Sequence, residues 1–184
     1  RAHLAEFGII TAQGPHKLAA LLDAMREDGM PGLPDIAHCA LESLMAQLDS
    51  LAEEIRTLER RLLAWHRTDE TSQRLETIPG VGLMTATALS ASIPDPSVFK
   101  TGRQFAAFLG LVPRQNSSGG KERLGRISKM GDGYLRRLLV VGATSVIRRV
   151  GTNTSATGDW VRRLLERKRA RAATVALANK PRRS

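Results

Sequence analysis

The most regular feature of the sequence is a stripe of apolar residues in its first half. Steps of three and four residues alternate without interruption along the stripe, which consists of Leu41, Leu44, Leu48, Leu51, Ile55, Leu58, Leu62 and Trp65. This spacing is the seam of a heptad repeat, and it predicts one long helix from about Ile36 to His66. The seam either packs inside the chain's own domain as a core helix or pairs with another subunit as a coiled coil.

A second pattern predicts two helices joined by a tight turn. The turn is the segment Ile78-Pro79-Gly80-Val81-Gly82, and apolar residues at helical spacing follow it from Thr85. This arrangement resembles the helix-hairpin-helix motif, in which backbone amides hold a DNA phosphate without reading the base sequence. Gly80 and Gly82 are therefore candidate phosphate contacts. The alternative is a glycine-rich turn inside a helical core.

Capping residues predict further helices. One short helix is expected from His16 to Met25, and another begins after Thr101 and ends at Gly110. Asp132 caps a longer helix that should run to about Arg149. The residues of this helix expected to face inward are Leu135, Leu138, Leu139, Gly142 and Val146.

The composition agrees with a mainly α fold. Apolar residues make up 42% of the 184 positions but aromatic residues only 4%, and such a composition favours helices over strands. We expect a long coiled-coil helix followed by a compact helical domain, which carries the helix-hairpin-helix-like motif and a Gly/Arg-rich serine loop. The expected divisions are residues 1–35, 36–67, 68–150 and 151–184, the last being a basic helix and tail.

The charge is unevenly distributed along the chain. The formal net charge is +10, yet residues 1–99 hold 8 Lys and Arg against 14 Asp and Glu, whereas residues 100–184 hold 20 against 4. So strong a basic excess points to a polyanionic partner, either nucleic acid or an acidic membrane surface. No apolar run reaches the roughly 20 residues of a membrane span. Insertion into a membrane is therefore not expected, and DNA becomes the expected partner only with the motifs described below.

The cysteine and histidine residues offer no metal site. Cys39 is the single cysteine, so an intramolecular disulfide is excluded, and the four histidines are scattered without zinc-ligand spacing. These features fit a reducing cytoplasm. We place no metal ligands and no cofactor in this chain.

Residues 113–137 carry the candidate chemistry. Glycines let the backbone approach a ligand closely, and seven cations surround them: Arg114, Lys121, Arg123, Arg126, Lys129, Arg136 and Arg137. The segment lacks the Gly-Lys-Ser/Thr ending of a nucleotide-binding P-loop. A serine in such a loop suits attack of its hydroxyl on a DNA phosphodiester, with guanidinium groups stabilising the transition state. The alternative is a flexible basic loop without chemistry.

A basic helical stretch is expected near the end of the chain, after a loop from Gly151 to Gly158. Leucines and valines lie opposite its cations, which are Arg162, Arg163, Arg167, Lys168, Arg169 and Arg171. Either this face lies against nucleic acid or it is a solvated cationic surface.

Residues 75–150 resemble the C-terminal transposase domain of the bridge-RNA-guided, or DEDD-type, bacterial insertion-sequence transposases. The segments that carry the resemblance are 78–82, 99–104, Leu109-Gly110-Leu111-Val112-Pro113-Arg114, Ser117-Ser118-Gly119-Gly120-Lys121, and Ile127-Ser128-Lys129 with Gly131 and Leu135-Arg136-Arg137. The family's nucleophilic serine directly precedes a glycine in this loop. The resemblance therefore implies Ser118 as the catalytic residue, with Ser117 as the alternative.

The resemblance implies further components. Complete family members also have an N-terminal RuvC-like domain with four acidic metal-binding residues, and the acids in residues 1–99 mostly lie on a helix without the strands which that domain requires. We therefore expect Mg²⁺ only in the missing domain, and a guide RNA as a further partner. The chain also ends in Pro181-Arg182-Arg183-Ser184, where the family's last helix normally continues. A fragment or a degenerate copy, inactive alone, is expected.

Three functions thus remain open. The first is a transposase module with a serine nucleophile, and the second is a non-catalytic nucleic-acid-binding module. The third is a coiled-coil oligomerisation protein, which accounts for residues 36–66 but leaves the basic half without a role.

Overall fold

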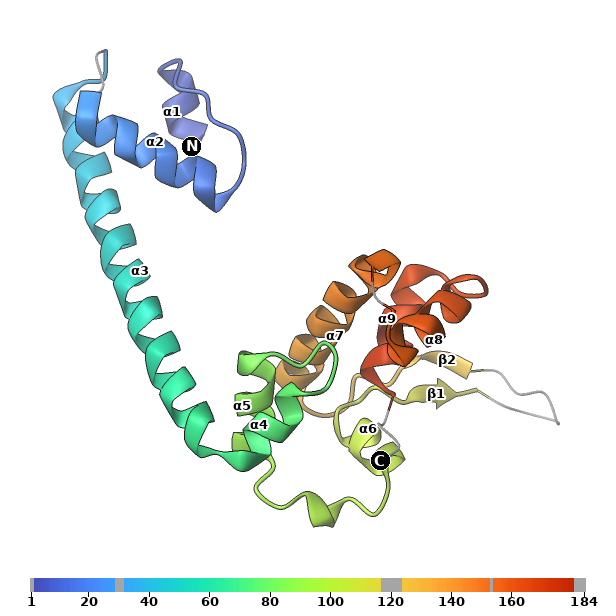
Figure 1. Cartoon of the computed structure of the whole chain (residues 1–184). Coiled ribbons are helices and arrows are strands. Elements are labelled where there is room, and N and C mark those ends of the chain that lie inside the picture. Colours follow the sequence, from blue (N-terminus) through green and yellow to red (C-terminus); the bar gives the residue numbers. More distant parts are fainter. Residues whose placement is uncertain (1, 29–31, 117–123, 153, 181–184) are drawn as a thin grey trace. The chain divides into compact units, whose positions relative to one another are not determined.

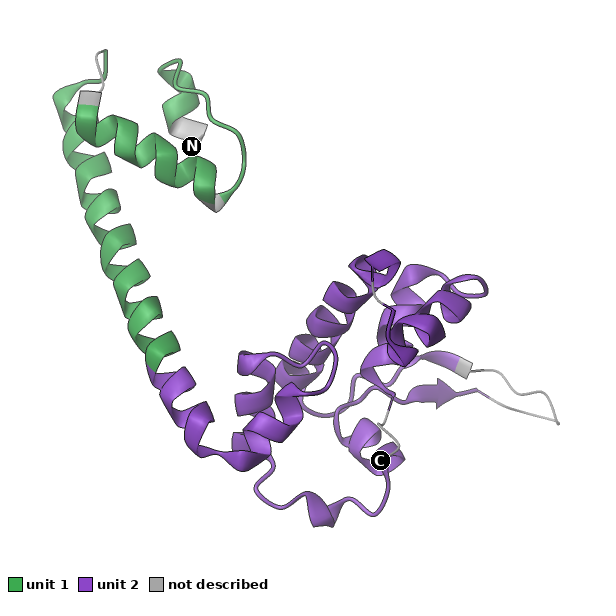
Figure 2. Cartoon of the chain, viewed as in Figure 1, with its two compact units in different colours: residues 1–60 green, residues 61–184 purple. Residues whose placement is uncertain are grey.

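The computed structural model describes residues 2–28, 32–116, 124–152 and 154–180. These residues are mainly helical, which confirms the predicted fold class (Figure 1). The chain divides into two compact units, residues 1–60 and 61–184 (Figure 2). None of the helices described is both long enough and apolar enough to cross a membrane.

The first unit consists of two helices and most of a third. The bounds are Ala2–Glu6 for α1, Pro15–Asp28 for α2 and Asp35–Thr68 for α3, whose last turns belong to the second unit. The long helix predicted for 36–66 is confirmed, and the predicted helix of residues 16–25 is slightly longer than expected. Arg26 in the last turn of α2 forms an ion pair with Asp49 of α3. This pair ties α2 to the early part of α3.

The heptad seam of α3 is largely uncovered. The exposed fractions are 54% for Leu44, 55% for both Leu51 and Ile55, and 57% for Leu58. Within its own unit, therefore, this stretch of α3 is not a core helix. Among the two readings left open by the sequence, the exposed seam favours pairing with another chain.

The second unit adds a two-stranded sheet to a set of short helices. The elements in chain order are α4 (Glu70–Glu76), α5 (Leu83–Ser92), α6 (Gly102–Phe108), β1 (Pro113–Gln115), β2 (Leu124–Ile127), α7 (Gly133–Arg148), α8 (Ala156–Leu165) and α9 (Ala170–Ala178). Short 3₁₀ turns lie at Pro96–Val98 and Val150–Thr152. The predicted caps are confirmed: Thr101 accepts from the Gln104 N–H, and Asp132 accepts from the N–H groups of the first turn of α7.

Two features of this unit differ from the prediction. The pattern gave no sign of the strands, because three and four residues are too few for a visible alternation. The basic stretch near the end was expected as one helix but forms two, α8 and α9. The chain turns between them over residues 166–169.

Helix α7 is the centre of the second unit, with α5 and α9 packed against it. The main core cluster consists of Leu89, Leu109, Leu111 and Leu135. A second cluster joins Ala143 of α7 to Val161 and Leu177 of the last two helices. Leu135 is fully buried, as predicted from its place on the inward face.

A contact between two glycines fixes α7 against the turn that precedes α5. A Cβ built on Gly142 would lie 1.8 Å from the carbonyl oxygen of Gly80, and one built on Gly80 would lie 3.0 Å from the Gly142 backbone. Gly80 also has a φ of +89°, which L residues rarely adopt. Packing therefore requires glycine at position 142, and the positive φ together with the close contact favours it at position 80.

Candidate nucleic-acid interface

The candidate loop is carried by the β1–β2 hairpin. The strands pair antiparallel, with Pro113 opposite Ile127 and Gln115 opposite Leu124. Backbone bonds continue the pairing below the strands, from the Ser128 N–H to the Val112 carbonyl and from the Lys129 N–H to the Gly110 carbonyl. We call these paired segments, residues 110–112 and 128–129, the foot of the hairpin.

The predicted nucleophile and two of its neighbouring cations lie outside the described residues. Ser118, its alternative Ser117, and the cations Lys121 and Arg123 all fall in 117–123. Their roles stay predictions from the sequence. The structure describes the strands on either side of them.

Close backbone contacts hold the foot of the hairpin against the end of α6. A Cβ on Gly110 would lie 2.2 Å from the Met130 carbonyl oxygen, and one on Gly131 would lie 1.9 Å from that of Phe108. Both glycines have positive φ, and so does the non-glycine residue Lys129, at 56°. The segments before β1 and after β2 therefore meet backbone to backbone. This contact fixes where the hairpin leaves the core.

Three of the predicted cations project into solvent beside the hairpin. Arg114, Arg126 and Lys129 are all exposed, and none has an ion-pair partner among the described residues. Arg114 donates to the Ser128 carbonyl at 3.3 Å, which directs its guanidinium across the foot. Cations without ion-pair partners around this foot are suited to holding phosphate groups.

The two adjacent arginines of α7 have different surroundings. Arg136 is half-buried and donates to the Leu109 carbonyl at 2.9 Å, which joins α7 to the end of α6. Arg137 is exposed. Arg136 therefore has a packing role that its sequence pattern did not reveal. Phosphate binding by either residue remains a prediction.

The two helices α4 and α5 and the tight turn between them are present as predicted, but the two glycines of the turn have different surroundings. Gly80 packs on Gly142 of α7, as expected for a turn inside a helical core. Gly82 is exposed, caps α5 without a side-chain bond, and has open space where a Cβ would stand. Of the two candidate phosphate contacts, Gly82 is the one whose surroundings leave room for a ligand.

A cluster of cations surrounds the turn between α8 and α9. The exposed members are Arg163, Arg167, Lys168, Arg169 and Arg171. Arg162, by contrast, is partly buried and donates to the Val150 carbonyl at 2.9 Å and to Asp159. Five exposed cations so close in sequence form a second cationic surface on this unit.

Sequence reasoning missed a buried polar cluster at the junction of α3, α4 and α5. The imidazole of His66 lies 2.7 Å from the Ser72 hydroxyl through Nδ1 and 3.0 Å from the Glu76 carboxylate through Nε2. Because an ionised carboxylate only accepts, Nε2 donates to Glu76, and in the neutral form of the ring Nδ1 then accepts from the Ser72 hydroxyl. This order resembles a catalytic triad, but Ser72 is fully buried. The cluster therefore joins helices rather than meeting a substrate.

Asp69 extends the same junction. Its carboxylate caps α4 by accepting from the Ser72 N–H at 3.1 Å, and it also accepts from the Ser90 hydroxyl of α5. The hydrogen bond from Ser90, with those from the backbone of α4, lowers the pKa of Asp69 below its usual value. The charged form is therefore the one that the folded state favours.

We expect Asp69 to make the stability of the second unit depend on pH. Because its pKa is lower in the folded chain than in the unfolded one, its contribution is present above the unfolded pKa of about 4 and is lost as the pH falls through the folded pKa. Asp69→Asn keeps an acceptor but removes the charge. The stability difference between wild type and Asp69→Asn, measured by urea unfolding, should be largest near neutral pH and shrink below about pH 4. A difference independent of pH would contradict this.

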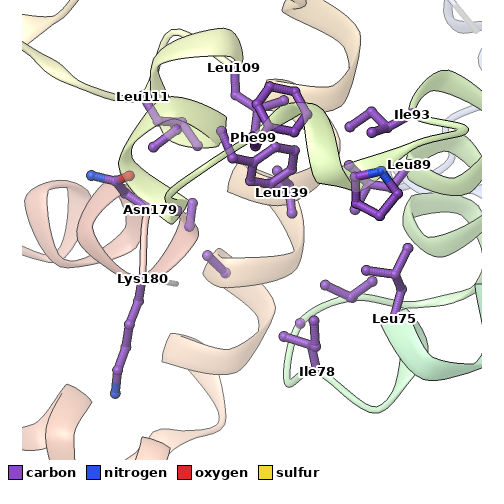
Figure 3. Close-up of a pocket in the computed structure, with 18 of the residues that line it drawn as sticks. Leu75, Ile78, Leu89, Ile93, Phe99, Leu109, Leu111, Leu139, Asn179 and Lys180 are labelled. Atoms are coloured by element: carbon purple, nitrogen blue, oxygen red, sulfur yellow. The ribbon is translucent and has the colours of Figure 1, made fainter. Parts of the chain in front are cut away.

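An apolar pocket lies elsewhere on the same unit. It encloses about 750 Å³ and is lined mainly by apolar side chains, among them Leu75, Ile78, Phe99 and Leu139 (Figure 3). Lys180 is at its edge, with its ammonium 4.3 Å from the centre of the Trp160 ring. Its lining offers no His, Cys, Asp or Glu. We therefore place the candidate chemistry at the hairpin.

A family profile described as the transposase IS116/IS110/IS902 family matches residues 72–159. The match covers the helix–turn–helix, the hairpin, α7 and the start of α8. It thus covers all the predicted site residues.

Named relatives are similar over nearly the whole chain. A Sinorhizobium fredii protein that bears the transposase name y4pF/y4sB is 45% identical over 181 residues, which are 98% of this chain and 46% of that protein. A "Probable family 20 transposase" of Pseudomonas aeruginosa is also 45% identical, over 98% of this chain and 54% of its own length. The "Transposase for insertion sequence element IS1111A" of Coxiella burnetii is 39% identical, with shares of 98% and 50%. The chain spans about half the length of these relatives.

Proposed function

We propose that residues 72–159, which match the profile of the IS116/IS110/IS902 transposase family, are a domain of that family and that the chain acts in insertion-sequence transposition, with Ser118 as the nucleophile that attacks DNA. The single observation that carries the proposal is the hairpin itself. Its foot is held against the core by backbone contacts, exposed cations without ion-pair partners lie beside that foot, and the serine falls in the segment between its strands.

The proposed step exchanges one phosphate ester for another. The Ser118 oxygen attacks a DNA phosphorus, the bond from that phosphorus to a deoxyribose oxygen breaks, and the serine proton ends on the released hydroxyl. Because an ester replaces an ester, no external energy source is needed. Negative charge accumulates on the phosphoryl oxygens during the attack, and the guanidinium groups of Arg114 and Arg126 are suited to stabilise it.

Three finer parts of the proposal rest on the family resemblance alone. We propose a guide RNA as a partner, action at the bacterial nucleoid, and a RuvC-like domain that supplies Mg²⁺. The relatives are about twice as long as the matched segment, so the activity of a whole transposase is a proposal for this chain.

The test of this function is a search for a covalent protein–DNA adduct. The chain would be incubated with target DNA, alone and with a complete family member plus its RNA, and the adduct mapped by peptide mass spectrometry. An adduct on Ser118 is the expected result. Tight binding without any adduct under both conditions would decide against the enzyme.

A non-catalytic nucleic-acid-binding module is the second candidate, favoured by the cationic surface between α8 and α9. For either function we expect duplex binding that is indifferent to sequence and falls steeply with salt, because cations displace condensed counterions from the phosphates. Titration at several salt concentrations measures the slope. Replacing Arg167 and Arg171 by Glu should make the DNA affinity depend less steeply on salt. A wild-type affinity that does not change with salt would show that the basic half is not the contact surface.

We also propose that the chain self-associates through the α3 seam. Exposed leucines at heptad spacing are costly in water, and a second helix would cover them.

A further inference from the structure

We propose that a second copy of the chain packs antiparallel along residues 48–65 of α3, with Glu54 of each copy beside Arg61 of the other. This inference rests on the self-association proposed above and adds to it the direction and register of the two helices. It is argued from burial, heptad positions and charge.

The seam is exposed from Leu44 to Leu58, and the segment that we pair begins at Leu48. Leu41 is half-buried, Leu44 is 54% exposed, and the Arg26–Asp49 ion pair ties α2 to α3 beside Leu48. From Leu48 onward the exposed seam side chains include Leu51, Ile55 and Leu58, and Trp65 is still 42% exposed. The exposed seam thus includes Leu44, and the charges beside the seam, not its exposure, decide where the paired segment begins.

This segment is complementary to itself when reversed. Its six seam positions alternate in the spacing of a and d positions, and in an antiparallel pair each a position faces a d position of the other helix. Residues 48, 51 and 55 then face residues 65, 62 and 58 of the second copy, so every seam side chain of the segment is covered. The paired segment is about 27 Å long, at 1.5 Å per residue.

The charges beside the seam distinguish the two directions. Glu54 and Arg61 precede a positions and so lie on one side of the seam, whereas Glu59 follows a d position and lies on the other. A parallel pair would place Glu54 beside Glu59 of the other helix, which is repulsive. The antiparallel pair places Glu54 beside Arg61, and does so twice.

These charges are available for such contacts. The ion pairs within this stretch of α3 join Glu53 to Arg56 and Arg60, on the face away from the seam. Among the described residues, Glu54, Glu59 and Arg61 have no ion-pair partner. A longer antiparallel overlap starting at Leu41 would instead bring Glu54 beside Glu54 of the second copy. Charge thus selects the register that pairs residues 48–65, and Leu44, which is 54% exposed, stays outside the pair.

Charge reversal tests the direction with the full chain and without DNA. The dimer dissociation constant would be measured by analytical ultracentrifugation at low salt for wild type, Glu54→Arg, Arg61→Glu and the double variant. Each single reversal turns two attractive contacts into two repulsive ones, so each should weaken the dimer about tenfold. The double variant should return to within about threefold of wild type. Circular dichroism checks that the helices are intact.

Other results would overturn the proposal in distinguishable ways. Tighter association of Glu54→Arg would indicate a parallel pair, because the new guanidinium would then attract Glu59 of the other helix. Unchanged association of both single variants would exclude the Glu54–Arg61 register while leaving self-association in place. A monomeric wild type at tens of micromolar would exclude self-association itself, yet would leave the adduct assay on Ser118 unaffected.

Cross-linking tests the antiparallel direction of the two α3 helices independently. In a Cys39→Ser background, Leu48→Cys and Trp65→Cys are prepared as separate proteins. The antiparallel pair predicts a disulfide only when the two are mixed. A disulfide within either protein alone would indicate a parallel pair and overturn the proposal.

Discussion

Ser118→Ala is expected to abolish covalent attachment to DNA when the chain is supplied with a complete family member and its RNA. Removal of a nucleophile lowers the rate by at least about a thousandfold, which takes the adduct below detection. Noncovalent DNA affinity should stay within about twofold of wild type, because the exposed cations around the hairpin supply most of the binding. Gel-shift titration and denaturing electrophoresis measure the two properties separately.

Ser117→Ala is the matched control, since it removes the neighbouring hydroxyl without touching the proposed nucleophile. If this variant loses attachment and Ser118→Ala retains it, the nucleophile is Ser117. If neither variant loses attachment, the serine mechanism is wrong for this chain. Arg114→Ala should behave differently from both, because a guanidinium that contacts phosphate before and during the reaction affects binding and rate together.

Gly142→Ala should destabilise the second unit strongly, although alanine is the better helix former. In an open helix the change would stabilise by about 1 kcal/mol. Here the new methyl group would lie 1.8 Å from the Gly80 carbonyl oxygen, so α7 and the turn before α5 must separate. We expect a net loss of about 3 kcal/mol, which corresponds to a fall in melting temperature of about 6–12 °C for a chain of this size.

Gly133→Ala is the control in the same helix. A Cβ there would meet only the end of the flexible Arg136 side chain, at 3.5 Å. Its melting temperature, followed by circular dichroism, should stay within about 2 °C of wild type, since a change at an exposed site is worth a few tenths of a kcal/mol. An equally stable Gly142→Ala would show that the two backbones are not in contact.

Helix boundaries and caps were accessible from the sequence because they depend on residues near each other in the chain. The heptad spacing predicted the length of α3, and Thr101 and Asp132 marked the starts of α6 and α7. The uneven charge and the motifs around residues 78–82 and 109–121 also led to the resemblance to transposases, and the comparisons find similarity to a transposase family profile and to proteins that bear this name. The roles of Ser118 and Ser117 remain predictions.

Only the tertiary structure shows which distant segments each of these residues contacts. Gly80 looked like a phosphate contact, but it lies against a helix more than 60 positions later, and that packing, together with its positive φ, favours glycine there. Arg136 and Arg137 are equivalent in the sequence, yet one is held by the Leu109 carbonyl and the other is exposed. His66, a seam neighbour in the pattern, is buried between Ser72 and Glu76. Local pattern sets where a helix begins and which face is apolar, whereas the partner of each side chain depends on which distant segments pack together.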